Sequence, residues 1–426
     1  MSNPTTTRTS CRVCGQMTLT PILSLGKLCV SDFTKEAQAK QQEPLEMVLC
    51  ATEHRGCGLL QLRHTVSHED MYRNYWYRSG VNKTMTNELF SIAQRVKNLV
   101  RLNPGDFVID IGANDGTLLK SYGIEDLMTV AFEPARNLIP YTEKNAAVVF
   151  NDFFSHDIWA KKFGKIQAKG ITAIAMFYDL EDPNGFVKDV AKCLDPEGVF
   201  IIQMSYLPLM LSQNAFDNIC HEHLEYYSLA SLEYLLVRHG LQVFDVEIND
   251  INGGSFRIYI KHKESREVQA PIGSEVRLES LRLYEANLGL DSAQAYQAFS
   301  QRVEGIKKTI KFFIQEEIFY GKKIYVYGAS TKGNTLLQYF DLDRKLIGAA
   351  AERNKDKWGL YTIGTGIPII SEEQARSERP DYFLVLPWHF AAEFKERERQ
   401  FLERGGKLIM PLPVPTIISV DGEKPL

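Results

Sequence analysis

The sequence predicts an α/β protein in which a small β-rich domain precedes two domains built on Rossmann-like, doubly wound sheets. Three observations lead to this fold class. Four of the seven cysteines form one pattern near the N-terminus, among short apolar runs. A buried strand, a glycine turn and a helix follow at 107–120, and strands then alternate with helices. The same pattern of strand, turn and helix returns at 323–333, which predicts a second, smaller sheet.

Length and composition indicate a globular protein of two or three domains. The chain has 426 residues, of which 44% are hydrophobic, and this gives ample core. The net charge of -4 gives no electrostatic reason to expect nucleic acid. The N-terminal MSNPTTTRTS is polar and no apolar run reaches about 18 residues, so neither a signal peptide nor a membrane span is expected. We therefore expect a cytoplasmic monomer or homodimer without nucleic acid or membrane partners.

The N-terminal cysteines form one pattern, Cys11-x-x-Cys14 followed by Cys50 and Cys57. In a chain without a secretion signal, thiols so spaced favour zinc over disulfides. The first pair has the spacing of zinc ligands, whereas the second pair is more widely spaced, and His54 could replace Cys50. Free thiols in a domain with little core are the alternative. Four thiolates would close the tetrahedron around a structural Zn²⁺ and leave no position for catalysis.

An aromatic segment follows this first domain, which we place at residues 1–69. Short strands are expected in the domain at 23–33, 45–49 and 58–62. The aromatic segment, 71–80, leads into a helix expected at about 83–100. It suits a substrate-binding wall, but aromatic packing between two domains would have the same composition.

The stretch FVIDIGANDGTLLK at 107–120 carries the most chemistry. It predicts a buried strand, a turn from Gly112 to Gly116 and the start of a helix. Glycines let the backbone approach a ligand closely, and a helix N-terminus favours a carboxylate or a phosphate. A second strand ends at Glu133, about twenty residues beyond the turn, where a nucleoside ribose is held by its hydroxyls.

The spacing of the two glycines favours S-adenosylmethionine over a dinucleotide. The three-glycine GxGxxG pattern is absent, and the wider D-x-G-x-x-x-G turn cradles the amino-acid end of the methyl donor. Asp152, just past the third strand, suits an adenine amino group. The residues expected to bind the cofactor are Asp110, Gly112, Asn114, Asp115, Gly116, Glu133 and Asp152. An ordinary strand-to-helix turn is the alternative.

The central domain, placed at residues 70–242, alternates strand and helix as a doubly wound sheet does. Strands are expected at 107–111, 127–132, 147–150, 171–177 and 198–204. Ligands of such sheets bind beyond the carboxyl ends of the strands. Polar residues at these ends are Glu133, Asp152, Tyr178, Asp179 and Gln203.

Titratable residues are concentrated past this sheet, around His221-Glu222-His223. Two histidines flanking a glutamate could suggest a metal, but on a helix they diverge, and no partner four residues away is present. A histidine with a carboxylate beside it suits acid–base chemistry better. A lone histidine is usually only a satisfied polar residue, but such a concentration favours catalysis.

The third region, placed at residues 243–426, predicts a second α/β sheet. A strand pair is expected at 243–248 and 256–260, a charged helical stretch at 275–317, and strands at 323–327, 346–351, 367–370, 382–386 and 407–410. The loop after the first of these five strands contains Gly328, Ser330 and Lys332. Its amides and ammonium suit a diphosphate, and Arg353 is expected at the same edge of the sheet. A structural repeat with a vestigial turn is the alternative.

Together these motifs resemble the sugar C-methyltransferases, which methylate carbon 3 of nucleotide-linked 4-keto-deoxysugars. The motifs run in order over nearly the whole chain: CRVCG from Cys11, GCGLLQL from Gly56, Tyr75-Trp-Tyr77 with Ser79, VIDIGANDGTLL, Asp152-Phe-Phe, Glu222-His223, NGGSFR from Asn252, VYGASTKG from Val326 and GTGIP from Gly364. The resemblance implies a zinc-binding domain, a class I methyltransferase domain, and a C-terminal domain that contributes to binding a nucleotide-linked sugar.

The resemblance also implies roles for single residues. His223 is the base that removes the proton next to the ketone, Glu222 orients it or contacts the sugar, and Tyr77 donates to the developing oxyanion. The enolate so formed can attack the sulfonium methyl group in line. Residues expected to contact the substrate are Tyr75, Ser79, Asp179, His221, Gly328, Ser330, Lys332 and Arg353. The zinc ion would only shape the N-terminal lobe.

Two positions depart from the family pattern. Members that act on antibiotic sugars often have a histidine where this chain has Asp179, and a tyrosine where it has Cys220. These changes bear on which sugar and nucleotide are accepted. Methyl transfer itself is less affected, because Glu222 and His223 are retained.

Other functions are weighed against this one. The chain could methylate a different sugar or another small molecule. An oxidoreductase or epimerase could bind a nicotinamide dinucleotide at the Gly328 loop, but that loop lacks the third glycine. A non-catalytic protein that binds zinc or a sugar nucleotide would leave the donor loop and His223 unexplained.

Overall fold

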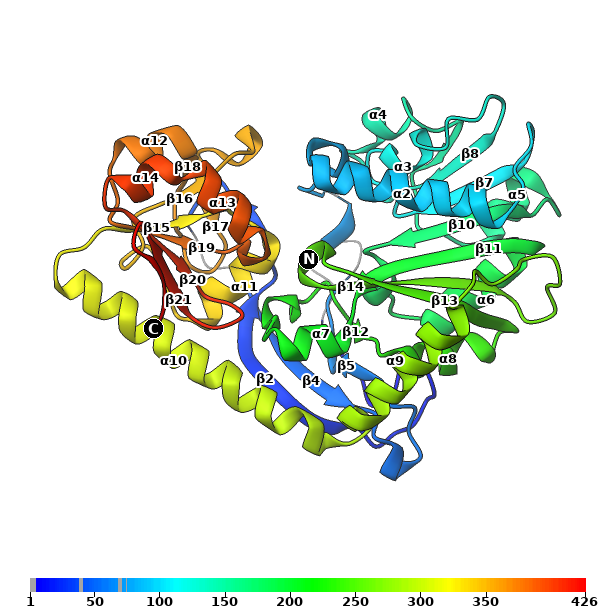
Figure 1. Ribbon diagram of the computed structural model, residues 1–426, viewed down its shortest axis with the longest axis horizontal. Coiled ribbons are helices and arrows are strands. Elements are labelled where there is room, and N and C mark those ends of the chain that lie inside the picture. The colour runs from blue at the N-terminus through cyan, green and yellow to red at the C-terminus, as the bar shows by residue number, and fades with distance from the viewer. Residues whose placement is uncertain (1–4, 38–40, 68–70, 74) are drawn as a thin grey trace.

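The computed structural model describes residues 5–37, 41–67, 71–73 and 75–426. Figure 1 shows two α/β domains side by side, with the blue strands of the N-terminal domain below and between them. The predicted boundary between residues 69 and 70 lies outside the described residues. None of the described helices combines the length and the apolar character that a membrane crossing requires.

The N-terminal domain is a small antiparallel sheet that is completed by a strand from the central domain. Its elements are β1 (Thr6–Thr7), β2 (Thr20–Cys29), β3 (Phe33–Thr34), β4 (Gln42–Leu49), η1 (Thr52–His54), β5 (Leu60–Leu62) and β6 (His64–Thr65). The main sheet has the order β12-β5-β4-β2. In it β12 (Glu225–Tyr226) lies antiparallel to β5, with Glu225 opposite Gln61. The segment that carries His223 is therefore fixed to the N-terminal sheet.

The central domain is a twisted sheet of seven strands with helices packed on it. Its elements are η2 (Ser79–Val81), α2 (Lys83–Leu99), β7 (Phe107–Ile111), α3 (Thr117–Lys120), β8 (Met128–Phe132), α4 (Ile139–Thr142), β9 (Val148–Phe150), α5 (His156–Phe163), β10 (Ala168–Ile174), η3 (Phe177–Asp179), α6 (Pro183–Cys193), β11 (Leu194–Ser205), α7 (Leu207–Ser212), η4 (Phe216–Asn218), α8 (Leu229–Val237), β13 (Leu241–Asn249), η5 (Ile251–Gly253) and β14 (Ser255–His262). The strand order is β13-β14-β11-β10-β7-β8-β9. The chain changes direction across the sheet between β7 and β10, which is where ligands of such sheets bind.

Two sequence predictions differ from the structure here. The strand predicted at 171–177 ends at Ile174, because Ala175 has a φ of 53° and the chain then turns into η3. The strand pair assigned to the third region is β13 and β14, and β14 pairs with β11 in the central sheet. The boundary predicted at 242 therefore falls inside β13.

The C-terminal domain has its own sheet of seven strands. Its elements, with the helices that lead to it, are α9 (Ser274–Leu288), η6 (Ala293–Tyr296), α10 (Gln297–Phe319), β15 (Ile324–Tyr327), α11 (Thr331–Tyr339), β16 (Ala350–Glu352), η7 (Lys355–Lys357), β17 (Tyr361–Thr362), β18 (Ile369–Ser371), α12 (Glu372–Ser377), β19 (Tyr382–Val385), η8 (Trp388–Phe390), α13 (Ala391–Arg397), α14 (Arg399–Glu403), β20 (Lys407–Met410), β21 (Thr416–Ser419) and β22 (Gly422–Pro425). The strand order is β18-β16-β15-β19-β20-β21-β22. The helical stretch predicted at 275–317 is broken, because Gly289 ends α9 in the left-handed conformation with a φ of 63°.

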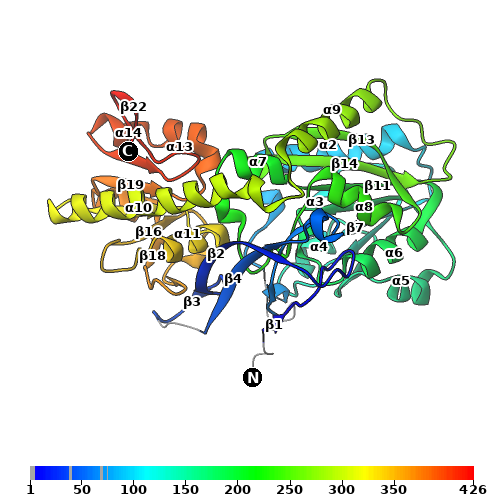
Figure 2. The ribbon, with the colours of Figure 1, turned by 90° about the horizontal axis from the view of Figure 1, so that it is seen from below.

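The N-terminal sheet packs against both α/β domains. Figure 2 shows it between them, with α10 running along the same side of the molecule. Leu49 and Leu60 share one apolar core with Val303 of α10 and Val326 of β15. On the other side, Cys11, Cys50 and Cys57 lie in the core of the central domain. In addition, β3 pairs with β17 of the C-terminal domain.

Candidate active site and metal centre

Four thiols of the N-terminal domain gather at one point. The Sγ atoms of Cys11, Cys14, Cys50 and Cys57 lie within 4.8 Å of one another, with 3.6 Å between Cys11 and Cys57 and 3.4 Å between Cys14 and Cys50. Sulfurs about 2.3 Å from a tetrahedral zinc ion are about 3.8 Å apart, so the spacing fits zinc.

Two tight turns bring these cysteines together. Gly15, with a φ of 78°, follows Cys14, and Gly58, with a φ of 77°, follows Cys57. Glycine is favoured at both places because side chains rarely accept this left-handed backbone. His54, the alternative ligand to Cys50, lies outside the cluster, and its side chain is 44% exposed. The structure therefore selects Cys50.

Two glycines shape the turn between β7 and α3. Gly112 has a φ of 69° and Gly116 a φ of 76°. A Cβ atom at Gly112 would lie 3.1 Å from Met176 Cγ, and one at Gly116 would lie 2.8 Å from Asn145 Cβ. The turn thus needs glycine for its backbone angles and also for the space beside it.

Glu133 reaches this turn from the end of β8. Its Oε2 accepts a hydrogen bond from Asn114 N at 2.7 Å, and its Oε1 accepts one from Ala135 N at 2.7 Å. Burial raises the pKa of Glu133 to about 7, although these bonds lower it. A buried carboxylate with further lone pairs, at the switch point of the sheet, fits the ribose hydroxyls of an adenosine-bearing cofactor.

Asp110 supports the turn from below. Its Oδ1 accepts a hydrogen bond from Thr172 Oγ1 at 2.6 Å, which links β7 to β10. Burial raises the pKa of Asp110 to about 7. The Asp110 side chain therefore makes its hydrogen bond within the sheet, beneath the turn expected to bind the cofactor.

Asn114 and Asp115 hold a strap, residues 75–80, across the turn. Ser79 N donates to Asn114 Oδ1 at 3.0 Å, and Gly80 N donates to Asp115 Oδ2 at 2.8 Å. Both side chains were predicted to bind the cofactor. In the structure they fix the aromatic strap beside the loop.

Tyr77 and Asp152 lie at the rim of this region. The carbonyl of Tyr77 accepts a hydrogen bond from Asn114 Nδ2 at 3.1 Å, and 44% of the residue is exposed. The Asp152 side chain is 52% exposed and lies 3.6 Å from the guanidinium of Arg73. Both side chains are accessible to a ligand.

His223 is buried and held in one orientation. Its Nδ1 lies 2.8 Å from the carbonyl oxygen of Asn218. Because a carbonyl oxygen only accepts, Nδ1 carries the proton and Nε2 keeps the lone pair. The ring lies 4.2 Å from that of Tyr178. Burial, and then the charge of Lys332, lower the pKa of His223 to about 3.

Glu222 lies beside this imidazole. A ligand atom from each of Cys220, Glu222 and His223 falls within 4.8 Å of the others. Burial raises the pKa of Glu222 to about 7, although the charge of Lys332 lowers it. The three atoms could hold a metal ion, but the ammonium of Lys332 already provides positive charge there, so acid–base chemistry is the better account.

Three tyrosines surround the carboxyl groups of this cluster. The Tyr72 hydroxyl donates to the carbonyl oxygen of Glu222 at 3.0 Å and also bonds Asp179. Burial, followed by the charge of Asp179 or Glu222, raises the pKa of Tyr72, Tyr75 and Tyr178. Burial and the charge of Glu222 likewise raise the pKa of Asp179. The cluster is thus rich in protons that can be donated to an oxyanion.

His221, which was predicted to bind the substrate, faces the other way. Its Nε2 lies 3.1 Å from the carbonyl oxygen of Glu43 in β4. Burial lowers its pKa to about 4. Because the segment is a turn at this point, adjacent residues point toward different domains. His221 therefore joins the segment 218–228, which carries His223 and is called the reaction segment below, to the N-terminal sheet.

The C-terminal loop is built like the first. Gly328 has a φ of 86°, and a Cβ atom there would lie 2.6 Å from Pro387 Cγ. Ser330 caps α11, because its Oγ accepts a hydrogen bond from Gly333 N at 3.0 Å. Ala329 N donates to Glu352 Oε2 at 2.9 Å. Gly328 and Ser330 therefore shape the loop.

Lys332 leaves this loop and reaches the central domain. Its Nζ donates to Asn218 Oδ1 at 2.6 Å. This contact brings one predicted substrate residue to the His223 cluster. Arg353 does not join them, because it is exposed and lies 3.4 Å from Glu393.

The loop that carries Cys11 and Cys14 also contacts the reaction segment. Arg12, between the first two cysteines, places its Nε 3.7 Å from Glu225 Oε1, and both side chains are fully buried. Its Nη2 donates to Thr65 Oγ1 at 2.6 Å. Zinc held by the cysteines on either side would fix this buried arginine, whose charge faces the carboxylate two residues after His223.

Several of these residues were missed by sequence reasoning. Asn218 precedes the titratable residues around His223, and Tyr72 belongs to the aromatic segment. Their positions in the sequence were therefore only weak indications that they belong to the site. Arg12 stands between two ligands, where a buried charge is unexpected. The contact between Lys332 and Asn218 has no local signal, because the two residues come from different domains.

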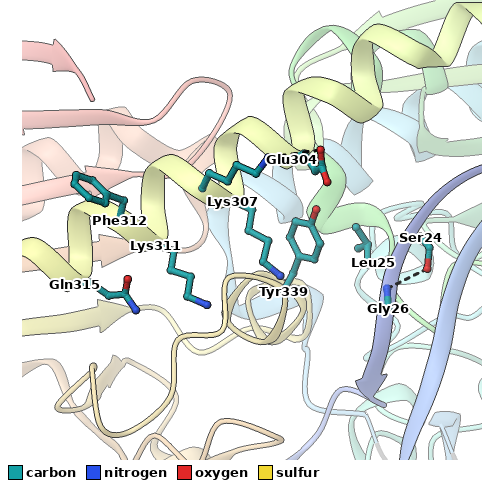
Figure 3. Close-up of a pocket in the computed structure, with 10 residues that line it drawn as sticks. Ser24, Leu25, Gly26, Glu304, Lys307, Lys311, Phe312, Gln315 and Tyr339 are labelled. Carbon is teal, nitrogen blue, oxygen red and sulfur yellow. Dashed lines mark hydrogen bonds and ion pairs between the residues drawn. The ribbon is translucent and has the colours of Figure 1, made fainter.

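A separate hollow of about 560 Å³ lies along α10 (Figure 3). Its lining includes Lys307 and Lys311, which both pair with Asp341, at 3.3 and 3.0 Å. It is an open surface groove and contains none of the predicted site residues. The groove is therefore separate from the cluster at the strand ends.

Comparison with known families covers almost the whole chain. Three family models match in succession: "Putative zinc binding domain" at residues 11–72, "Methyltransferase domain" at 82–246 and "C-methyltransferase C-terminal domain" at 250–413. The chain thus carries the domains of a C-methyltransferase, in the order in which the sequence predicts them. Its central domain is of the S-adenosylmethionine-dependent kind, and the turn glycines with Glu133 fit that cofactor. The predicted fold class and both predicted cofactors are confirmed.

Individual relatives agree with the family. The C-methyltransferase NovU of Streptomyces niveus is 29% identical over 418 residues, which is 96% of this C-methyltransferase and 97% of the relative. Two solved methyltransferases are more distant. Magnesium protoporphyrin IX methyltransferase from Synechocystis PCC 6803 has 11% identity and a TM-score of 0.34, over 42% of this chain and 87% of that one. CcbJ from Streptomyces caelestis has 13% identity and a TM-score of 0.33, over 41% and 89%. Neither likeness bears on the function.

Proposed function

We propose that this C-methyltransferase acts on carbon 3 of a nucleotide-linked 4-keto-deoxysugar. The observation that carries the proposal is the buried cluster of His223 and Glu222 with Lys332 beside it. Carbon methylation needs a base near the reacting carbon, donors for an enolate oxygen and exclusion of water. The buried imidazole, the tyrosines and the burial of the cluster supply these three needs.

His223 removes the proton next to the ketone. Its Nε2 carries the lone pair, because Nδ1 is bound to the Asn218 carbonyl. The carbon–hydrogen bond breaks, its electron pair forms the enolate, and the proton goes to Nε2. Glu222 lies beside the ring and orients it or contacts the sugar, as the family resemblance implies.

The enolate oxygen needs hydrogen-bond donors. Tyr77 is the donor implied by the resemblance, and Tyr75 and Tyr178 stand closer to the carboxyl groups of the cluster. Their raised pKa values keep these hydroxyls protonated. S-adenosylmethionine, held by the glycine turn and Glu133, supplies the electrophilic methyl group.

The C-terminal loop is proposed to bind the nucleotide part of the substrate. The reacting sugar then lies between that loop and His223, because Lys332 already spans the two domains. The substrate residues proposed are Tyr75, Ser79, Asp179, Gly328, Ser330, Lys332 and Arg353. Cytoplasm is the proposed location, because a four-cysteine zinc site needs reduced thiols.

Transfer of a labelled methyl group to a panel of nucleotide-linked 4-keto-6-deoxysugars tests the proposal. Deuterium exchange at carbon 3, measured in parallel without the methyl donor, reports enolate formation directly. His223→Asn should slow both by about 10²- to 10⁴-fold. His156→Asn, on α5 and far from the cluster in sequence, is the matched control and should change neither.

The outcomes separate the parts of the proposal. If exchange and methylation survive His223→Asn, another group is the base. If the cofactor binds but every sugar in the panel is inert, the substitutions at Asp179 and Cys220 indicate another acceptor, and the assignment to carbon 3 is wrong.

A further inference from the structure

Lys332 is the point at which the C-terminal domain touches the reaction segment. It stands in the first turn of α11, and its Nζ donates to Asn218 Oδ1 at 2.6 Å. Asn218 is 4% exposed, and its side chain is further fixed by Asn218 Nδ2 donating to Ala215 O at 3.0 Å. Ser205 Oγ also donates to Asn218 Oδ1, at 3.3 Å. The ammonium is therefore bound to a rigid acceptor.

The same asparagine holds the base. The backbone carbonyl of Asn218 accepts from His223 Nδ1 at 2.8 Å and from the Tyr226 hydroxyl at 3.3 Å. One residue thus binds Lys332 by its side chain and His223 by its backbone. A movement of the ammonium away from Asn218 changes the polarity and position of the carbonyl that orients the imidazole.

The charged and titratable groups around His223 come from four parts of the molecule. Its own segment provides Cys220, Glu222, Glu225 and Tyr226, η3 provides Tyr178 and Asp179, the aromatic segment provides Tyr72 and Tyr75, and the C-terminal domain provides Lys332. After burial, the charge of Lys332 is the next cause that keeps the pKa of His223 low, at about 3. A base works best when its pKa lies near the operating pH, so any rise in the pKa of His223 from this low value makes it a better base.

A diphosphate changes this balance. It carries negative charge, and a lysine at the N-terminus of a helix is a common binding group for phosphate. If the diphosphate attracts Lys332, the positive charge near His223 is neutralised, and the imidazole holds a proton more readily.

We propose that Lys332 is a positioning residue that connects the nucleotide site to the base through Asn218, so that a bound diphosphate alters the hydrogen bonds that orient His223. The proposal rests on the proposed function and adds regulation to the same site. Its consequence is that the base becomes stronger when the nucleotide part of the substrate is bound. Proton removal is then slower before the substrate is in place.

The test follows the His223 imidazole by NMR of ¹⁵N-labelled histidine in the whole, zinc-loaded protein. Its signal is assigned by its loss in His223→Gln. Thymidine diphosphate, guanosine diphosphate and inorganic pyrophosphate are the probes. In the wild type, a bound diphosphate should shift the His223 signals and raise its pKa by on the order of one unit.

Variants separate charge from general disturbance. Lys332→Met should raise the pKa of His223 without any diphosphate, and adding the probe should then change little. Lys332→Arg keeps the charge and should restore the response. Lys345→Met removes an exposed charge from the same domain and should behave as wild type. Unchanged affinity for S-adenosylmethionine in Lys332→Met shows that the variant is folded.

The proposal is overturned if His223 titrates identically in wild type and Lys332→Met, or if a diphosphate binds without changing the His223 signals. Failure of every probe to bind also overturns it. Because this readout needs no methyl transfer, it can fail while the methyltransferase assay succeeds, and the reverse can also happen.

Discussion

The two α/β domains use the same loop for different purposes. In each, a glycine with positive φ follows the first strand, Gly112 after β7 and Gly328 after β15. In each, a glutamate from the adjacent strand accepts hydrogen bonds from a loop N–H and from the residue two positions after itself. For Glu133 these are Asn114 and Ala135, both at 2.7 Å, and for Glu352 they are Ala329 at 2.9 Å and Asn354 at 2.8 Å.

The difference lies in what surrounds the glutamate. Burial raises the pKa of Glu133 to about 7. Glu352 has a cation beside it, since Lys357 Nζ lies 3.9 Å away and donates to Ala329 O at 2.7 Å. Behind the first loop, Glu133 therefore keeps lone pairs that can accept hydrogen bonds from a ligand. Behind the second loop, Glu352 is instead paired with Lys357. The same loop structure can thus bind a cofactor in one domain, and in the other it can hold Lys332 in position to contact a second domain.

Loss of zinc should have the largest effect, and it tests whether the two domains are independent. The N-terminal sheet pairs with the central domain through β12, and β3 of the N-terminal domain pairs with β17 of the C-terminal domain. Metal removal or Cys50→Ser should therefore abolish methyl transfer and lower the Tm of both domains, by about 10 °C or more. Scanning calorimetry before and after zinc is returned measures this. His54→Ala is the control, and a loss as large as that of Cys50→Ser would make His54 the ligand.

Alanine at either loop glycine should damage one ligand site and spare the other. The positive φ and the close contacts together cost about 2–5 kcal/mol. Gly116→Ala should weaken S-adenosylmethionine binding about 100-fold, and Gly328→Ala should do the same to nucleoside diphosphate binding. Titration calorimetry with each ligand measures both. Gly105→Ala has equal strain, with a φ of 86°, but open space around it, and should affect neither.

Replacing each glutamate by glutamine should distinguish the cofactor-binding role of Glu133 from the ion pair of Glu352 with Lys357. Glu133→Gln should reduce S-adenosylmethionine affinity about tenfold, because a ribose acceptor loses its charge. Glu352→Gln should leave that affinity unchanged but destabilise the C-terminal domain by about 1–3 kcal/mol, because Lys357 loses its partner. Equal effects of the two variants on cofactor affinity would contradict the distinction.

A smaller, pH-dependent effect should belong to the central domain alone. Asp110 has a raised pKa of about 7, whereas the corresponding position of β15 is Val326. The native state keeps the Asp110 proton that the unfolded chain releases at about pH 4. Stability from this group is therefore full below that pH and is lost as pH rises through 7. Asp110→Asn should raise the stability by about 1–2 kcal/mol at pH 8 and by almost nothing at pH 4. Urea unfolding at both pH values measures it, and an equal gain at pH 4 would contradict the assignment.

Local features of this fold were predictable from the sequence. The strand at 107–111 and the strand that ends before Glu133 were found because short apolar runs and glycine turns act over a few residues. The cysteine cluster was found because ligand spacing is also local. The membership of β13 and β14 in the central sheet was missed, because pairing between distant strands leaves no trace in either strand alone.

The candidate site shows the same limit. Glu222 and His223 were identified from one dense stretch, but their partners Tyr72 and Lys332 come from elsewhere in the chain. His221 was predicted to face the substrate and instead bonds Glu43, because side-chain direction in an irregular segment cannot be read from spacing. Sequence reasoning thus found the reactive groups and missed the contacts that orient them.

The two-residue strand β12 has a consequence for how the chain is made. The edge of β5 has no partner from β12 until Glu225 and Tyr226 have left the ribosome, and β3 waits still longer for β17. During synthesis one edge of the N-terminal sheet, and the strand β3, therefore lack their partners, and unpaired strands are sites of aggregation. The first domain to be synthesised is completed only after part of the C-terminal domain has been made, and zinc can hold its loops together throughout that interval.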